Sequence, residues 1–286
     1  MKKFYRGVFL YLLALSFLVG GGGKALAETS GDFLLEDGLP PLGANDPTCR
    51  PDAAHPEPIV LVPGTFETMA QNWSGLAPLL TAKGYCVYSL NYGYSSAGYS
   101  TGDIEDSAME LKVFIDNVLE HTGADKVSLV GHSQGGMMPR YYIKFLGGDK
   151  TVNDLIGLVP SNHGTKGFFG LSNPTWTVAD VLSCIACRQQ QSGSAFLEKL
   201  NQGDETPGQV SYTVVATRND EVVVPYTSSF LSESSKVTNI TLQDYYPLDQ
   251  IEHQFIPYDL NAFKFVFDAL AHEGPADPKR AVALFQ

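Results

Sequence analysis

The sequence predicts an α/β fold with a mostly parallel, doubly wound sheet. Short apolar runs of strand length alternate with stretches that carry apolar residues at helical spacing, and this alternation is typical of a parallel sheet covered by helices. The chain of 286 residues is 44% hydrophobic and 17% charged, which indicates a globular protein with a sizeable core. The sequence contains no internal repeat and no low-complexity tract that would indicate another architecture.

The first half of the chain begins with a buried strand followed by a helix. Residues 59–62 form a short apolar run of strand type, and residues 69–83 carry apolar side chains at helical spacing before Gly84, which suits a helix end. A second strand is expected at 85–90 and an amphipathic helix at 104–121. The apolar side of this helix consists of Met109, Leu111, Phe114, Ile115, Val118 and Leu119.

The second half repeats the alternation around one irregular segment. Strands are expected at 127–130, 155–159, 210–216 and 237–242, and helices at 137–146 and 258–271. Residues 161–208, here called the cap segment, lack the strand–helix rhythm. A further loop at 91–102 is rich in Gly, Ser and Tyr; its Tyr92, Tyr94 and Tyr99 are expected either to wall a pocket or to lie on the surface.

The N-terminus is typical of an exported protein. Three basic residues precede the apolar run 8–19, which is too short to span a bilayer, and Ala25-Leu26-Ala27 resembles a signal-peptide cleavage site. Residues 1–27 are therefore predicted to be a signal peptide, whose removal leaves 259 residues and no transmembrane segment. We expect a secreted protein, extracellular or periplasmic, in which residues 28–58 form an extended segment ahead of one folded domain at 59–286.

The charge of the chain argues against a nucleic-acid partner. The formal net charge is −12, and loss of the four basic residues of the signal peptide takes it to −16. Such an acidic surface repels phosphate backbones.

All four cysteines lie in the exported part, at positions 49, 86, 184 and 187. An even number of cysteines in an oxidising compartment suggests two disulfides, and four cysteines allow three pairings. We expect Cys49–Cys86, near two core strands, and Cys184–Cys187, within one loop. The alternative for Cys184-x-x-Cys187 is a redox or zinc motif, but the sequence offers no second ligand pair, so no metal is predicted.

Residues 127–136, V-S-L-V-G-H-S-Q-G-G, form the most informative motif. A strand runs into Gly131-His132-Ser133-Gln134-Gly135 and a helix-like stretch follows, which is the strand, sharp turn and helix of a nucleophile elbow. The turn exposes the hydroxyl of Ser133, and the flanking glycines leave room for the neighbouring backbone. The α/β-hydrolase fold is expected on this ground.

A serine nucleophile needs a histidine base and a carboxylate that orients it, and in this fold they follow in the order serine, acid, histidine. Asp220 follows the late strand 210–216 and is the predicted acid, with Glu221 as the runner-up. His253 lies in the loop before the final helix and is the predicted base. His272 lies at the end of that helix, where a surface residue is more natural than the base. His163 precedes the acid, which is the wrong order for the base, and it is expected to be a structural histidine in the cleft.

Acyl transfer also needs donors for the developing oxyanion. The backbone N–H of Gln134, directly after the nucleophile, is one predicted donor. The loop Pro63-Gly64-Thr65 after the first strand offers the second, because Gly64 allows close approach and Thr65 presents an N–H and a hydroxyl.

Over roughly residues 45–272 the chain resembles secreted bacterial triacylglycerol lipases and esterases of the α/β-hydrolase fold, and it is also similar to yeast-type lipase B. The resemblance rests on L-V-P-G-T-F at 61–66, on G-H-S-Q-G-G-M-M-P-R-Y-Y at 131–142, on P-S-N-H-G-T at 160–165 and on the Asp220 and His253 segments. It implies Ser133, Asp220 and His253 as triad, Thr65 and Gln134 as oxyanion donors and a Cys49–Cys86 disulfide. Pro63 departs from many bacterial relatives, which carry His there.

The cap segment is expected to select the substrate. Its apolar residues suit an acyl chain or a lipid–water interface, although a helical hairpin packed on the core explains them equally well. These residues are Phe168, Phe169, Leu171, Trp176, Val178, Val181, Leu182 and Ile185.

We therefore predict a monomeric hydrolase of lipid or other carboxylic esters that needs no cofactor. A polyester depolymerase or acyltransferase with the same triad is the alternative, and a non-catalytic exported binding protein is a third interpretation.

Overall fold

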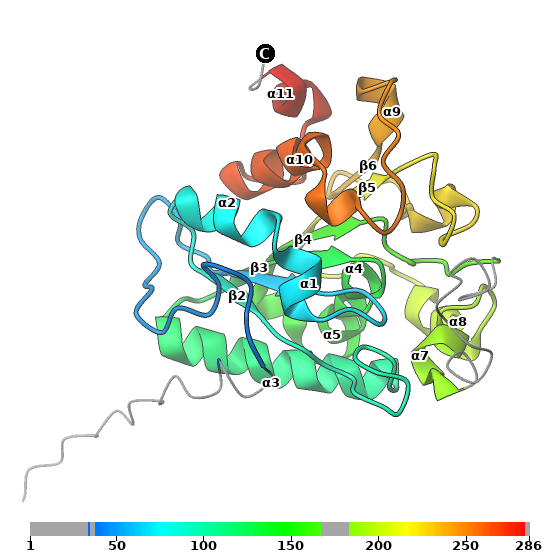
Figure 1. The fold of residues 1–286 in the computed structure, drawn as a ribbon, viewed down its shortest axis with the longest axis horizontal. Helices are drawn as coiled ribbons and strands as arrows, with labels where there is room; N and C mark the ends of the chain where they lie inside the picture. Colours follow the sequence, from blue (N-terminus) through cyan, green and yellow to red (C-terminus); the bar gives the residue numbers. More distant parts are fainter. Residues whose placement is uncertain (1–33, 35–37, 167–182, 284–286) are drawn as a thin grey trace, which may run out of the picture.

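A computed structural model describes residues 34, 38–166 and 183–283. In this part of the chain six strands form one parallel sheet in the order β2-β1-β3-β4-β5-β6, which confirms the predicted α/β class (Figure 1). The strands are β1 (Ile59–Val62), β2 (Val87–Ser89), β3 (Val127–His132), β4 (Val152–Leu158), β5 (Ser211–Ala216) and β6 (Val237–Thr241). The predicted signal peptide lies outside the described residues.

The strand order changes direction between β1 and β3. From β1 the chain first adds β2 on one side and then returns to place β3 on the other. At such a switch point the loops leaving two neighbouring strands diverge and open a crevice at the carboxyl edge of the sheet. Val62 is paired with Gly131, so the loop after β1 and the turn after β3 leave the sheet side by side.

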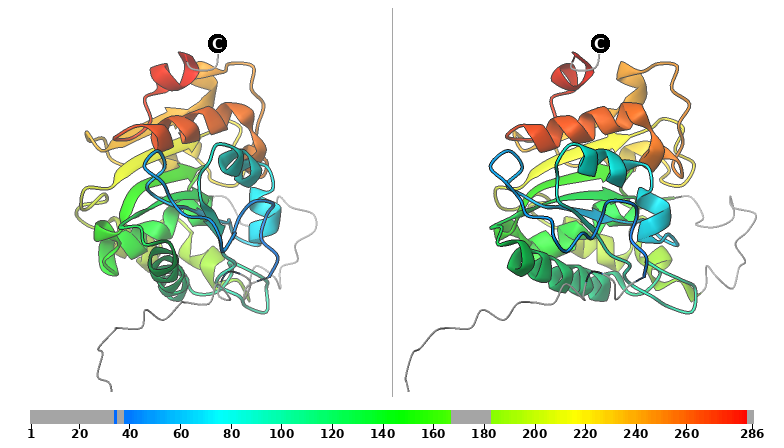
Figure 2. Two further views of the ribbon diagram at one scale, coloured as in Figure 1. Left: turned by 90° about the vertical axis from the view of Figure 1, so that its left-hand side faces the viewer. Right: turned by 60° about the vertical axis from the view of Figure 1, so that its left-hand side comes forward.

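Helices cover both faces of the sheet (Figure 2). They are α1 (Met69–Trp73), α2 (Leu76–Ala82), α3 (Ile104–Thr122), α4 (Gln134–Met137), α5 (Pro139–Phe145), α7 (Ile185–Gln189), α8 (Ala195–Asn201), α9 (Leu242–Tyr245), α10 (Leu260–Ala271) and α11 (Pro278–Ala283). Short 3-10 turns occur at η2 (Gly148–Lys150), η3 (Tyr226–Ser229) and η4 (Ile256–Tyr258). Helices α9 and α11 and the turns η2 and η3 have no counterpart among the predicted helices.

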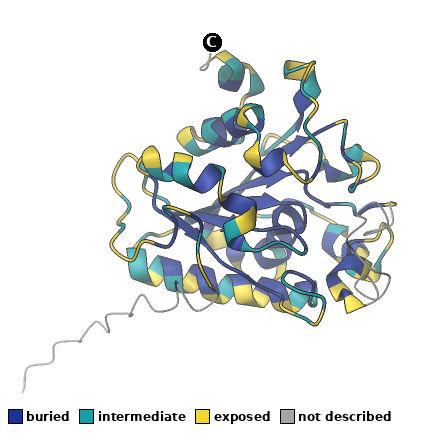
Figure 3. Cartoon of the chain, in the orientation of Figure 1, coloured by how far each residue is buried: buried dark blue, intermediate teal, exposed yellow. Residues whose placement is uncertain are grey.

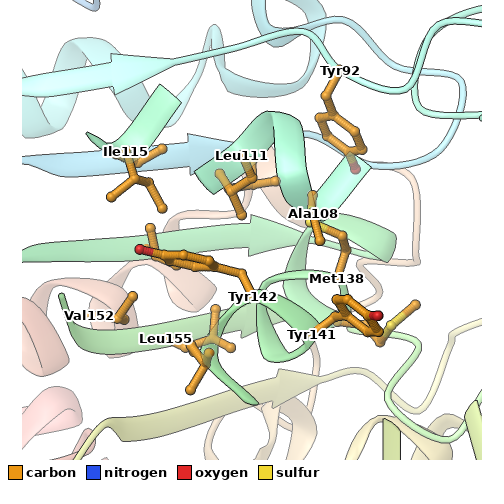
Figure 4. Packing of buried hydrophobic residues seen from close by; sticks show 14 of the residues in the cluster. Tyr92, Ala108, Leu111, Ile115, Met138, Tyr141, Tyr142, Val152 and Leu155 are labelled. Atoms are coloured by element: carbon orange, nitrogen blue, oxygen red, sulfur yellow. The ribbon is translucent and has the colours of Figure 1, made fainter. Parts of the chain in front are cut away.

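Two apolar clusters hold these layers together, one on each face. Because side chains alternate along a strand, Val60 of β1 joins the cluster with α3, α5 and α8, whereas Leu61 joins the cluster with α2, α10 and α11. Figure 4 shows part of the first cluster, including Ile115 of α3 and Tyr142 of α5. The strands are buried almost throughout, while the outer helix faces are exposed (Figure 3).

Two predicted helices are each divided in the structure. The helix expected at 69–83 breaks at Gly75, where an added Cβ would lie 2.9 Å from a ring carbon of Tyr258, so the chain bends where a close contact requires glycine. The helix expected at 137–146 starts earlier, at Gln134, and divides before Pro139. A proline lacks the N–H that a helix interior needs but suits the first turn of a new helix.

The described N-terminal segment follows the edge of β2. The Asn45 side chain donates to the Ser89 carbonyl (2.9 Å) and accepts from the Ser89 N–H (2.7 Å), so it replaces a missing neighbour strand. The disulfide Cys49–Cys86 fixes the same segment, and both expected disulfides are present. No helix in the described part of the chain is long and apolar enough to cross a membrane.

The described part of the cap segment is packed on the core. Helices α7 and α8 contribute buried side chains to the cluster around α3 and α5, among them Ala186, Phe196 and Leu200. This arrangement fits the helical hairpin that was the alternative to a cap, although Ile185 stays 38% exposed. The other apolar residues of the prediction, from Phe168 to Leu182, lie outside the described residues, so the cap stays a prediction.

Candidate active site

Ser133 lies on a strained turn between β3 and α4. Its backbone has φ 54° and ψ −121°, a conformation that is costly for a residue with a Cβ. The turn is possible because neighbouring positions lack side chains. A Cβ on Gly131 would lie 1.9 Å from the Gly135 carbonyl oxygen, and one on Gly135 would lie 2.1 Å from that of Val62. The predicted elbow is therefore present, with its glycines required sterically.

Ser133 begins a chain of buried hydrogen bonds. Its hydroxyl oxygen lies 3.0 Å from Nε2 of His253, and Nδ1 of His253 lies 2.9 and 3.0 Å from the two carboxylate oxygens of Asp220. All three residues are buried. The carboxylate also accepts the N–H groups of Val222 and Val223, which fix its orientation. The structure thus brings together the three side chains that the order of the sequence selected.

The alternative acids and bases lie elsewhere. The Glu221 carboxylate accepts the backbone N–H of His253 (3.4 Å), whereas the bonds to Nδ1 of the imidazole ring come from Asp220. His272 bonds to the Asp268 carbonyl at the end of α10 (2.9 Å). His163 pairs with Glu205 (2.8 Å), and a structural role in the cleft stays the prediction for it.

The charges around His253 favour its protonated form. Burial lowers the pKa of its imidazole, but the carboxylate of Asp220, by charge and hydrogen bond, together with Glu221 and Glu67, outweighs burial and raises the pKa above the ordinary value of 6.5. The ring can therefore accept a proton readily, as a base must.

The loop after β1 lies against the elbow. A Cβ on Gly64 would come within 3.3 Å of the Ser133 Cβ, so the missing side chain permits this approach. The Gly64 N–H donates to the Asn72 side chain (2.7 Å), and the Tyr92 hydroxyl donates to the Pro63 carbonyl (2.7 Å). Tyr92 thus supports this loop from the core, whereas Tyr94 is exposed and contacts the ring of Tyr99.

Two backbone N–H groups in this region have no acceptor among the described residues. Within the described part of the chain, the backbone N–H groups of Thr65 and Gln134 donate to no protein acceptor. Gln134 is the first residue of α4, where an N–H has no partner inside the helix. These are the two donors that the sequence predicted for an oxyanion.

Gln190, which the sequence did not point to, joins the two residues. Its Nε2 donates to the Thr65 hydroxyl (3.0 Å) and to the Gln134 side-chain oxygen (2.7 Å), and its side-chain oxygen Oε1 accepts from the Ser161 hydroxyl (2.7 Å). The Thr65 hydroxyl in turn donates to the Gln134 side chain (2.8 Å). Gln190 directly follows α7 and is fully buried, so the described part of the cap segment braces the oxyanion loop.

We expect Gln190→Ala to lower kcat about 10-fold with little change in KM. Removal of an oxyanion donor itself lowers kcat about 10²- to 10³-fold, and the effect should be smaller here because Gln190 only braces the residues that carry the donors. Gln189→Ala is the matched control, since the side chain of Gln189 bonds to Asp103 and the Ile104 N–H at the start of α3, and not to the oxyanion loop. Steady-state kinetics on a soluble ester measure both, and equal kcat values would contradict the bracing role.

A cavity of about 350 Å³ lies next to these loops. It is lined by Thr65, Phe66, Glu67, Gln71, Gln254, Phe255 and Tyr258. Gln254 follows His253 directly, so the cavity adjoins the base. No group of three or more metal-ligating side chains is gathered anywhere in the described residues.

Known lipases match this chain. A sequence model of the family described as Lipase (class 2) matches residues 56–258. A triacylglycerol lipase of Pseudarthrobacter phenanthrenivorans is 36% identical over 95 residues, 31% of this chain and 28% of the relative. Lipase B of Pseudozyma antarctica is 27% identical over 185 residues, 64% of this chain and 51% of that protein. The chain thus spans about a quarter to a half of the length of these curated relatives.

Solved structures agree on the architecture. Lipase B of Aspergillus fumigatus superposes with a TM-score of 0.66 and 25% identity, covering 78% of this chain and 54% of that one. A Bacillus licheniformis lipase in its mature form gives a TM-score of 0.59 at 20% identity, over 77% of this chain and 94% of the other. The expected α/β-hydrolase fold is therefore confirmed.

Proposed function

Because the chain belongs to the class 2 lipase family, we propose that it hydrolyses carboxylic esters of lipids through an acyl-enzyme on Ser133. The observation that carries this proposal is the buried chain from Ser133 through His253 to Asp220, with hydrogen bonds of 3.0 and 2.9 Å. Such a chain activates a serine hydroxyl, which is a poor nucleophile by itself.

In the proposed reaction Ser133 Oγ attacks the ester carbonyl while His253 Nε2 accepts its proton. Asp220 keeps the proton of the ring on Nδ1 and stabilises the imidazolium that forms. His253 then passes the proton to the leaving alcohol. In the second half, the same histidine activates a water, which attacks the acyl-enzyme and releases the acid with free Ser133.

The tetrahedral intermediate in each half carries a negative oxygen. We assign it to the backbone N–H groups of Thr65 and Gln134, which are otherwise unpartnered within the described chain. Donors already in place need no rearrangement during the reaction, which is why such sites stabilise transition states strongly.

The direct test is covalent labelling. A fluorophosphonate is expected to label Ser133, and peptide mapping locates the adduct. In the labelling experiment, absence of the fluorophosphonate adduct on Ser133 would favour a non-catalytic binding protein.

The mass of the protein tests the predicted export. Protein recovered outside the cytoplasm is expected to have the mass of a chain that starts at residue 28.

The substrate class needs a second measurement. A chain-length series of triacylglycerols, assayed below and above the solubility limit, is expected to show hydrolysis with a rate increase at the limit if the cap segment meets a lipid interface. Preference for polymeric esters or for alcohol acceptors would instead indicate a depolymerase or an acyltransferase.

The pKa of His253 sets the pH dependence. His253 must be neutral to accept the Ser133 proton, and its pKa is raised, so kcat/KM should fall as pH drops through a midpoint above 6.5. A pH profile on a soluble ester measures this midpoint. A midpoint below 6.5 would contradict the balance of charges described for this ring.

A further inference from the structure

We infer that His132 is a positioning residue that ties the elbow, the base loop and the oxyanion loop together, an inference that rests on the proposed ester hydrolysis. His132 immediately precedes the nucleophile and is 2% exposed. Its ring lies beside that of His253, with centroids 5.2 Å apart. It contacts neither Asp220 nor the Ser133 hydroxyl by any hydrogen bond within the described chain, so its role differs from that of the base.

The first tie runs to the base. Nε2 of His132 lies 3.0 Å from the backbone carbonyl of His253. A carbonyl can only accept, so Nε2 carries a proton and donates. This bond fixes the backbone of the very residue whose side chain must reach both Ser133 and Asp220. The nucleophile and the base are thus coupled through the residue next to the nucleophile as well as through their own contact.

The second tie runs to the oxyanion loop. Nδ1 of His132 lies 3.0 Å from Glu67 Oε2 and 3.1 Å from Asn72 Nδ2. Glu67 is two residues after Thr65, and the Asn72 side-chain oxygen accepts the Gly64 N–H (2.7 Å). One imidazole therefore contacts Glu67, which follows Thr65 in this loop, and Asn72, which holds the loop at Gly64.

A third contact closes the arrangement. The second carboxylate oxygen of Glu67 accepts from the side chain of Gln254, the residue after His253. Glu67, His132, His253 and Gln254 thus form a closed circuit between loops that are far apart in the sequence. Since a displacement of about 1 Å at a reacting group can cost about 100-fold in rate, loss of the central ring should be felt in catalysis.

Two substitutions at one position test the inference. His132→Leu removes both ties at similar bulk, whereas His132→Gln places an amide N–H where Nε2 lies and can restore the bond to the His253 carbonyl. We expect His132→Leu to lower kcat about 10- to 100-fold with KM within about twofold. His132→Gln is expected to recover most of this loss.

The outcomes separate the inference from the proposed function and from simple destabilisation. If native protein is neither labelled by the fluorophosphonate nor active, the hydrolase proposal itself fails. If native protein is active and His132→Leu keeps its kcat, the positioning role is wrong. Thermal unfolding is measured for both variants; a Gln variant as slow as the Leu variant, at native stability, would also overturn the tie to His253.

Discussion

Ser133→Ala is expected to lower kcat on p-nitrophenyl esters by about 10⁵- to 10⁶-fold. Without the Oγ atom no acyl-enzyme forms, and His253 has no proton to accept. The residual rate should come from the oxyanion donors and substrate binding alone, which act on attack by water. The fold should persist, because alanine keeps the Cβ that the strained turn already accommodates.

Ser235→Ala is the matched control, since Ser235 is an exposed serine just before β6. Its kcat should equal that of the native protein. Fluorophosphonate labelling should disappear in Ser133→Ala and persist in the control. Substantial activity in Ser133→Ala, with the label moved to another residue, would show that the elbow serine is not the nucleophile.

The first strand was predictable because a strand buried on both faces of a parallel sheet needs a continuous apolar run. Residues 59–62 are such a run and form β1 with the predicted bounds. Helix bounds depended on local chemistry. Asp103 accepts two N–H groups at the start of α3 and Gly123, at φ 72°, ends it within one residue of the prediction. By contrast, the break at Gly75 depends on a close approach of Tyr258, which is 183 residues away in sequence.

The residues of the candidate site also fall into those that the sequence predicts and those that depend on contacts between distant segments. Ser133, Asp220 and His253 were predictable because their order and their places after strands are imposed by the fold. Gln190 was not, because nothing near it in sequence marks it; its partners Thr65 and Gln134 are 125 and 56 residues away. His132 was recognised as part of the motif, but its bond to the His253 carbonyl exists only after the sheet brings the two loops together.

Asp220→Asn is expected to lower kcat about 10⁴-fold while the fold stays intact. The asparagine oxygen can still accept the N–H groups of Val222 and Val223, so the loop keeps its shape. Its amide, however, can donate to Nδ1 of His253. That bond favours the tautomer with the proton on Nε2, which then faces the Ser133 hydroxyl as a donor and cannot accept its proton.

The neighbouring carboxylate makes the test sharp. Glu221 follows Asp220 directly, and its negative charge raises the pKa of His253 although it makes no bond to the imidazole ring. Glu221→Gln removes this charge. We therefore expect Glu221→Gln to shift the acid limb of kcat/KM to lower pH while kcat at its plateau changes little. If the 10⁴-fold loss followed Glu221→Gln instead, the runner-up acid would be the working one. Only the side chain bonded to Nδ1 controls the tautomer of His253. The Asp220→Asn variant therefore reports the effect of this hydrogen bond on kcat, whereas the Glu221→Gln variant reports the effect of a nearby charge on the pKa of His253.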